Sequence, residues 1–270
     1  MEPELLDRLH ARHLEALLEI DRICRKHGIP YYIIAGTLLG AARHKGFIPW
    51  DDDLDIGLLR PDYEKLLRIL PQEMDSRYFL QCNTTDPEYH LPFAKVRING
   101  TKFVEYASQD CAIHHGIYVD LFPFDNVPAS GFGRKCHALI CRLLFVCALA
   151  RGKFRFPAGS QKSHAAFKVL RMLLKPFRLG FILRLMDNAM RMVKNADSEY
   201  IVNIGGAYGY RRESVRRDYF RETADLPFEG HAIQSPAHWH EYLTDFYGDY
   251  MTPPPEDKRY NRHSAVEVQF

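Results

Sequence analysis

The sequence predicts an α+β fold that carries a basic helical insertion. Over residues 1–128, short apolar runs typical of strands are mixed with amphipathic helical stretches, whereas residues 129–198 have helical spacing. The chain has 270 residues, of which 46% are apolar and 26% charged, the composition of a globular protein with a substantial core. We therefore expect a sheet with flanking helices and a separate helical segment.

The first half of the chain contains the expected strands. Leucines at three- and four-residue spacing predict an amphipathic helix over residues 3–27, which ends at Gly28 and Pro30. Pro61 suits the first turn of another helix, which runs to about residue 70. Strands are expected at residues 31–35, 54–59, 78–82, 93–98, 101–106 and 117–124.

Two further local patterns concern turns and helices. The pair Asn99-Gly100 lies between two expected strands and predicts a β-hairpin. Helices are expected over residues 132–152 and 163–195, divided by the segment 156–160.

The helical segment is strongly basic. Residues 131–194 contain 14 Lys and Arg and one acid, Asp187, whereas the rest of the chain has a net charge of −11. One interpretation is a helical cap with solvated basic faces, and another is a peripheral contact with an anionic membrane. We expect no nucleic-acid partner, because no recognised motif accompanies the charge.

The cysteines and the first residues of the chain indicate the cellular compartment of the protein. None of the six cysteines forms a CxxC pair, and Glu2, Glu4 and Asp7 are unlike the start of a secretory leader. We therefore expect reduced thiols in a cytoplasmic protein, at the inner face of the membrane if the basic segment binds lipid.

Closely spaced aspartates, at positions 51, 52, 53 and 55, begin the second expected strand. Alternation along a strand would place Asp51, Asp53 and Asp55 on one face and Asp52 on the face of Leu54. Clustered carboxylates repel one another, and a bound cation relieves that repulsion. Oxygen ligands favour Mg²⁺ or Mn²⁺, so the pattern predicts a metal site.

The aspartates also allow two other interpretations. A calcium-binding loop would need glycine at position 56 and glutamate at position 62, where the chain has Ile56 and Asp62. An acidic turn without function is disfavoured by the apolar residues Leu54 and Ile56, which follow Asp53 and Asp55 in alternation.

Neighbouring residues extend the predicted site. Gly36 and Thr37 open a helix, whose N-terminal N–H groups could receive a phosphate. Asp120 is an acid within an apolar strand, where an unpaired carboxylate would be costly, so we expect it to face the same cation. The alternative interpretation of Asp120 is an acid that is hydrogen-bonded near the end of a strand.

Basic side chains near these acids could neutralise phosphates. Lys95 and Arg97 lie two apart on an expected strand and should face the same side. For each basic candidate the alternative is a solvated surface charge. The candidates are Arg43, His44, Lys45, Lys95, Arg97 and Lys258.

The stretch AGTLLGAARHKGFIPW, residues 35–50, leads into the aspartates and resembles the LicD family, which includes phosphocholine transferases and relatives of fukutin. The tail resembles that family too, in FEG at residues 228–230, YGDYM at 247–251 and the prolines at 254 and 255. The family is similar to nucleotidyltransferases of the polymerase-β type. The resemblance implies a nucleotidyltransferase-like mixed sheet, with a catalytic core over residues 1–128, a basic insertion over 129–198 and a segment completing the catalytic domain over 199–270.

The resemblance also implies an activity. Family members transfer phosphocholine from CDP-choline, or ribitol phosphate from CDP-ribitol, to sugars. The implied reaction here moves a phosphate-linked group, most simply phosphocholine, from a CDP-linked donor to a glycan or lipid-linked glycan such as a lipopolysaccharide or teichoic acid precursor. Two Mg²⁺ (or Mn²⁺) ions would be held by Asp53, Asp55 and Asp120, with Asp51 as a further candidate ligand, and CMP would leave.

Two rival functions remain open from the sequence. A glycosyltransferase could use residues 51–53 as an Asp-x-Asp metal motif, although only about fifty residues precede it. A membrane-associated scaffold without catalysis would not need the acids at positions 53, 55 and 120.

Overall fold

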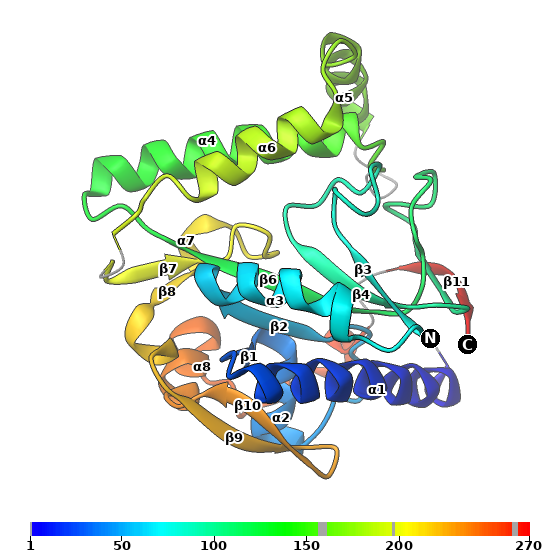
Figure 1. The fold of residues 1–270 in the computed structure, drawn as a ribbon, viewed down its shortest axis with the longest axis vertical. Coiled ribbons are helices and arrows are strands. Elements are labelled where there is room, and N and C mark those ends of the chain that lie inside the picture. The colour runs from blue at the N-terminus through cyan, green and yellow to red at the C-terminus, as the bar shows by residue number, and fades with distance from the viewer. Residues whose placement is uncertain (1, 156–160, 196–197, 261–263) are drawn as a thin grey trace.

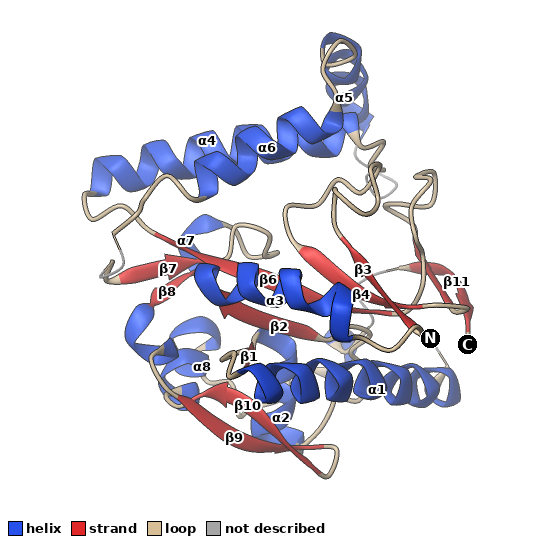
Figure 2. Ribbon diagram, in the orientation of Figure 1, coloured by secondary structure: helices blue, strands red, loops and turns tan. Residues whose placement is uncertain are grey.

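The computed structural model describes residues 2–155, 161–195, 198–260 and 264–270. At its centre is a mixed sheet with helices packed around it (Figures 1 and 2), so the expected mixture of helices and strands is confirmed. The strands of this sheet are β1 (Tyr32–Ile33), β2 (Asp55–Leu59), β3 (Tyr78–Gln81), β4 (Ala94–Ile98), β6 (Tyr118–Asn126), β7 (Tyr200–Val202) and β8 (Ser214–Arg216).

The strands are joined in the order β1-β2-β6-β4-β3, with β7 paired to β6 and β8 paired to β7. Only β2 and β6 run parallel among these pairs; the others are antiparallel. A parallel pair needs a long connection, and here it contains α3 (Arg60–Glu73), β3 and β4.

Two helices cover one face of the sheet. Helix α1 (Pro3–His27) lies across it beside α3 (Figure 1), and its residues Leu9, Leu17 and Ile20 are fully buried. The helix ends where Gly28 adopts a left-handed conformation, with φ of 57°, and its N–H is donated to carbonyls of the last turn.

The residues after 199 join the same body as the first half. Strand β7 extends the sheet from β6, and Tyr32 Oη donates a 2.5 Å hydrogen bond to the carbonyl of Phe220. The remaining elements are α2 (Ala35–His44), α7 (Tyr210–Glu213), α8 (Trp239–Tyr247), 3₁₀ turns at Arg217–Phe220 and Glu256–Lys258, the pair β9 (Thr223–Phe228) and β10 (His231–Pro236), and β11 (Ala265–Gln269) paired with β5 (Lys102–Glu105).

The basic segment folds as three helices. Helices α4 (Gly131–Arg151) and α6 (Leu179–Met190) lie side by side, and α5 (Gln161–Leu173) projects from them (Figure 1). The expectation of one helix over residues 163–195 is wrong, because the chain breaks at residues 174–178, which include Pro176. The expected division at residues 156–160 lies outside the described residues. Within the described parts of the chain, no helix is both long enough and apolar enough to cross a membrane.

The predicted hairpin at Asn99-Gly100 is also wrong. The chain does turn there, with Gly100 at a φ of 77°, but the two flanking strands do not pair with each other. Strand β4 is hydrogen-bonded on one edge to β3 and on the other to β6, so no edge is left for β5, which pairs with β11.

A buried ion pair ties α3 to the sheet. Arg60 begins α3, and its guanidinium donates to both carboxylate oxygens of Asp125 on β6, at 2.7 and 2.5 Å. The side chain of Asp125 is 2% exposed, and Arg60 also lies 3.2 Å from Asp187 of α6. Arg60 therefore connects the sheet to the basic helices.

We predict that Asp125→Ala lowers the free energy of unfolding by about 3 kcal/mol or more, because it leaves the Arg60 charge buried without its main partner. Urea denaturation measures this loss. The matched control is Asp110→Ala, which breaks an ion pair with Arg155 whose side chains are 45% and 43% exposed, and should cost less than about 1 kcal/mol. Equal losses in both variants would contradict the prediction.

Candidate functional site

A cavity of about 700 Å³ lies where the two halves of the chain meet. One part of its wall consists of residues from α2, the loop after it and strands β2, β4 and β6. The other part consists of residues 203–208 and 242–260, together with Glu213. Neither half of the sequence could form this cavity alone.

Three charged residues form a row across adjacent strands at the cavity. In the parallel pair, Asp55 of β2 lies opposite Asp120 of β6, and in the antiparallel pair Asp120 lies opposite Lys95 of β4. Opposed residues on paired strands point to the same face of a sheet, and all three line the cavity. Asp120 therefore lies beside Asp55 at the cavity, and the expectation that the two face one cation stays a prediction.

The centre of the row is an ion pair within the sheet. Lys95 Nζ lies 2.7 Å from Asp120 Oδ1, and both residues are at least 95% buried. The ammonium also lies 3.4 Å from the centre of the Tyr118 ring. Burial raises the pKa of Asp120, and the charge of Lys95 opposes that rise.

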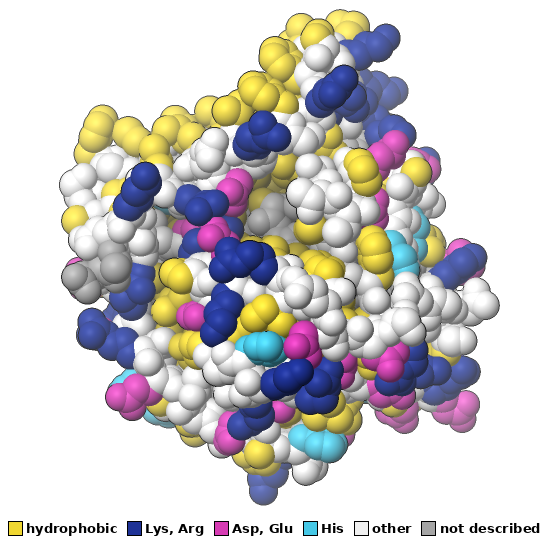
Figure 3. Space-filling model, in the orientation of Figure 1, with side chains coloured by type: hydrophobic (Ala, Val, Ile, Leu, Met, Phe, Trp, Pro, Cys, Tyr) yellow, Lys and Arg dark blue, Asp and Glu magenta, His cyan; other side chains and the backbone are white. Residues whose placement is uncertain are grey.

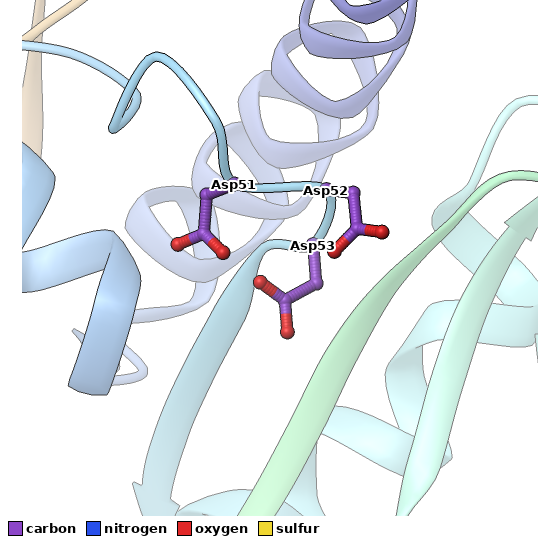
Figure 4. Close-up of side chains that lie close together, drawn as sticks. All are labelled: Asp51, Asp52 and Asp53. Atoms are coloured by element: carbon purple, nitrogen blue, oxygen red, sulfur yellow. The ribbon is translucent and has the colours of Figure 1, made fainter. Parts of the chain in front are cut away.

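The remaining aspartates precede β2 rather than belonging to it. The carboxylates of Asp51, Asp52 and Asp53 come from one bend (Figure 4), each with an oxygen within 4.8 Å of an oxygen of the others. Asp52 is separated from its neighbours at the cavity, as expected, but not by strand alternation, because the strand begins only at Asp55. Asp52 is 1% exposed and does not line the cavity, whereas Asp51, Asp53 and Asp55 do.

The start of α2 faces these acids. Gly36 lines the cavity, and a Cβ atom there would lie 2.6 Å from Asp51 Oδ2, so a side chain would collide with the acidic bend. Thr37 is buried behind the wall, where its Oγ1 accepts a 2.9 Å hydrogen bond from the backbone N–H of Asp55. Thr37 thus holds β2 against α2 and is not itself a lining residue.

Two of the predicted basic residues from outside the sheet line the cavity, namely Arg43 and Lys258. Arg43 is held by donating to the carbonyl of Tyr250 at 3.1 Å and to His44 Nε2 at 2.9 Å. His44 and Lys45 are exposed and do not line the cavity, and Lys45 is the left-handed residue that ends α2.

Arg97 is buried in structural contacts and does not line the cavity. It is 1% exposed, donates 2.7 Å hydrogen bonds to Gln81 Oε1 and to the carbonyl of Gly116, and lies over the Tyr118 ring. It shares a strand face with Lys95, as expected, but the cavity reaches only Lys95.

The far wall contains a buried acid that the sequence analysis did not single out. Glu213 accepts a 3.0 Å hydrogen bond from the N–H of Tyr208, and burial raises its pKa to about 7. A Cβ atom on Gly206 would lie 2.2 Å from this carboxyl, and one on Gly205 would lie 2.5 Å from Phe93. The adjacent pair of glycines was the available signal, because such pairs mark close approach of the backbone.

Segments that are distant in sequence close the site around α2. The carboxylate of Glu229, in the turn between β9 and β10, accepts a 3.0 Å hydrogen bond from the N–H of Phe47. The rings of Phe47 and Phe228 meet edge to face at 4.8 Å. The tail residues Tyr247, Asp249 and Tyr250 then line the cavity, where the carbonyl of Tyr250 is hydrogen-bonded to Arg43.

The cavity has an excess of acid. Seven carboxyl groups line it, against three cationic side chains, Arg43, Lys95 and Lys258. Hard oxygen ligands of this kind fit Mg²⁺ or Mn²⁺, and a bound cation would relieve the repulsion between them. The carboxyl groups are those of Asp51, Asp53, Asp55, Glu105, Asp120, Glu213 and Asp249.

Comparison with known proteins gives matches that include this site. Residues 28–135 match the family model described as LicD/FKTN/FKRP, nucleotidyltransferase domain. The lipopolysaccharide cholinephosphotransferase LicD of Haemophilus influenzae is 28% identical over 253 residues, which cover 89% of this chain and 89% of that protein. The human ribitol 5-phosphate transferase FKRP is 43% identical over 119 residues, which cover 41% of this chain but 21% of that protein.

The family match covers α2, the aspartates and β6, and the match to the Haemophilus protein extends along most of the chain. The resemblance first seen in residues 35–50 is confirmed: residues 28–135 match the LicD family, and the similarity to the Haemophilus protein continues beyond them.

Proposed function

We propose that this protein transfers phosphocholine from CDP-choline to a hydroxyl group of a glycan or lipid-linked glycan, and releases CMP. The observation that carries the proposal is the row Asp55–Asp120–Lys95 beside Asp53, at the floor of a cavity large enough for a nucleotide-linked donor. The names of two relatives support it, since one is a cholinephosphotransferase and the other a ribitol 5-phosphate transferase.

The charge of the cavity supports a metal-dependent reaction. A pyrophosphate would be repelled by seven carboxyl groups unless cations lay between them. In the proposal Asp53, Asp55 and Asp120 hold Mg²⁺ or Mn²⁺, with Asp51 as a further ligand. A bound ion of this kind supplies Lewis-acid stabilisation of the phosphate oxygens.

The chain's own groups have separate tasks in the proposed reaction. The start of α2 at Gly36 and the side chains of Arg43, Lys95 and Lys258 bind the donor phosphates. The acceptor oxygen forms a bond to the phosphorus distal to the nucleoside, while the bond from that phosphorus to the oxygen of CMP breaks. Asp120 accepts the proton of the attacking hydroxyl.

The aromatic lining supports choline as the group next to the transferred phosphate. Quaternary ammonium groups are recognised by aromatic faces, with carboxylates nearby to balance the charge. The aromatic residues at the cavity are Trp50, Phe93, Phe122, Tyr208, Tyr242, Tyr247, Tyr250 and Tyr260.

The proposed reaction predicts Mg²⁺-dependent release of CMP from CDP-choline with a glycan acceptor, and slower release from CDP-ribitol and CDP-glycerol. Asp53→Ala should lower turnover by about 10³-fold, equivalent to ~4 kcal/mol, because a metal ligand is lost. It should also weaken Mn²⁺ binding measured by calorimetry. Asp218→Ala, an exposed acid on a 3₁₀ turn, is the control and should change neither.

A negative result in this assay of CMP release is also informative. If no CDP-linked donor releases CMP and a nucleotide sugar is turned over, the proposal is replaced by that of a metal-dependent glycosyltransferase. Unchanged turnover in Asp53→Ala would remove the metal assignment.

Lys95 and Arg97 should differ although they lie on one strand face. Lys95→Gln keeps a donor to Asp120 but removes the charge in the cavity, so we predict a fall in kcat of about tenfold or more. Arg97→Gln should lower the free energy of unfolding by about 2 kcal/mol, because it abandons two buried hydrogen bonds, while kcat per folded molecule stays within about threefold. Activity assays corrected for folded fraction would contradict this if both variants lost kcat equally.

The raised pKa of Glu213 predicts that the stability of the folded protein depends on pH. Its carboxyl has a pKa of about 7 in the folded protein against 4.5 for an ordinary glutamate, so the folded state binds more protons between these values. The free energy of unfolding therefore falls as pH rises from 4.5 to 7, by at most about 3 kcal/mol. Glu213→Gln should be more stable than the parent at pH 8 and equal to it below pH 4.5.

Thermal unfolding at both pH values measures this effect. Glu222→Gln, at an exposed position, should show no such difference and serves as the control. A stabilisation of Glu213→Gln that did not change with pH would contradict the assigned cause.

A further inference from the structure

The helices α4, α5 and α6 carry most of the exposed apolar surface of the molecule. Fourteen large apolar side chains are exposed among the described residues, and eleven of them lie between Phe132 and Met192. We name the exposed apolar side chains of these three helices the helical face. Its most exposed members are Phe132 at 81%, Met172 at 67%, Leu173 at 63%, and Leu139 and Leu143 at 57% each.

The helical face lies on the side of α4 opposite its packing contacts. His137, Cys141 and Ala148 are at least 99% buried, with Cys141 packed against Met186 and Ala148 against Ile182 of α6. Leu139 and Leu143, four residues apart, share the other side of the helix. Figure 3 shows hydrophobic side chains gathered along the outer edge of these helices, away from the sheet.

Helix α5 packs on α4, where Arg171 Nε donates a 2.9 Å hydrogen bond to the carbonyl of Ala150, but it leaves its apolar side chains uncovered. Among its residues whose burial is described, 165–173, none is buried, although Val169, Met172 and Leu173 are apolar. Large apolar side chains exposed together on one helix indicate a surface that another apolar phase covers.

The net charge of the helical segment indicates which kind of surface covers the helical face. Residues 131–194 have a net charge of +13, so a second copy packed face to face would bring two such charges together. An anionic partner is favoured instead. Basic side chains beside long apolar ones are the pattern of helices that lie in a membrane interface, with the apolar side in the acyl region and the cations among the headgroups.

A basic cavity at the edge of the helical face suits anionic headgroups. It has a volume of about 560 Å³ and is lined by Arg151, Lys153, Arg178 and Arg184, against one carboxylate, that of Glu88. Helix α6 begins at this cavity, where its free N–H groups add positive potential. Phe181, which also lines the cavity, is part of the helical face, so the apolar and basic surfaces are continuous.

We propose that the helical face docks this protein on the surface of an anionic lipid bilayer, with α4, α5 and α6 lying in the interface and lipid phosphates meeting the basic cavity. The surface contact needs neither the donor nor the acceptor of the proposed reaction. The docking proposal and the proposed reaction can therefore fail independently of each other.

Co-sedimentation of the full chain with vesicles tests this docking. We expect binding to phosphatidylcholine vesicles that contain one third phosphatidylglycerol, and weak binding to vesicles of phosphatidylcholine alone. Leu139→Glu/Leu143→Glu should weaken binding to the anionic vesicles by about tenfold or more, since both side chains would leave the apolar phase. Lys168→Glu/Lys175→Glu, at two exposed positions, should reduce the preference for anionic lipid, because it lowers the net charge of residues 131–194 from +13 to +9.

The control is Val266→Glu, which replaces an exposed apolar side chain by glutamate at a position 52% exposed on β11, far from the helices in the fold. It should bind like the parent, and circular dichroism should show all variants folded. Absence of binding to anionic vesicles, or equal binding by parent and Leu139→Glu/Leu143→Glu, would overturn the proposal. A dimer in solution that the leucine substitutions dissociate, without vesicle binding, would assign the face to a second copy and overturn it too.

Discussion

The parallel pairing of β2 with β6 is the constraint on which the site depends. Its register sets Asp55 opposite Asp120, and the antiparallel pairing of β6 with β4 continues the row to Lys95. Carboxylates this close repel each other, and in a buried setting the repulsion is stronger than in water. Lys95 compensates one of them inside the sheet. The acids nearest the open cavity therefore provide the natural place for further cations.

The rest of the fold maintains this row from two sides. On one face, α1 and α3 cover the sheet, and the buried pair of Arg60 with Asp125 fixes α3 against β6. On the cavity side, Thr37 holds the backbone of Asp55, and Glu229 holds that of Phe47. Because Glu229 and the tail near Tyr250 come from the last quarter of the chain, the acidic bend becomes a closed site only when both halves have folded together.

Local sequence patterns predicted what depends on one element and failed where the answer depends on several. Alternation separated Asp52 from Asp51, Asp53 and Asp55 correctly with respect to the cavity, but for the wrong reason, because β2 begins only at Asp55. Lys95 and Arg97 have the same period and charge, yet their roles divide because Gln81 and the carbonyl of Gly116 meet Arg97 from other elements. Glu213 was missed because only the folded chain brings it to the cavity.

The uneven charge of the chain has a consequence for orientation at a surface. The helical segment carries +13 and the remainder −11, so the molecule has a strong charge asymmetry along the direction from the sheet to α4. An anionic bilayer attracts the first part and repels the second, which selects one orientation over its opposite without any specific lipid contact. Arg60, which contacts both Asp125 of the sheet and Asp187 of α6, links the helices to the catalytic body, so a surface that orients the helices also orients the cavity.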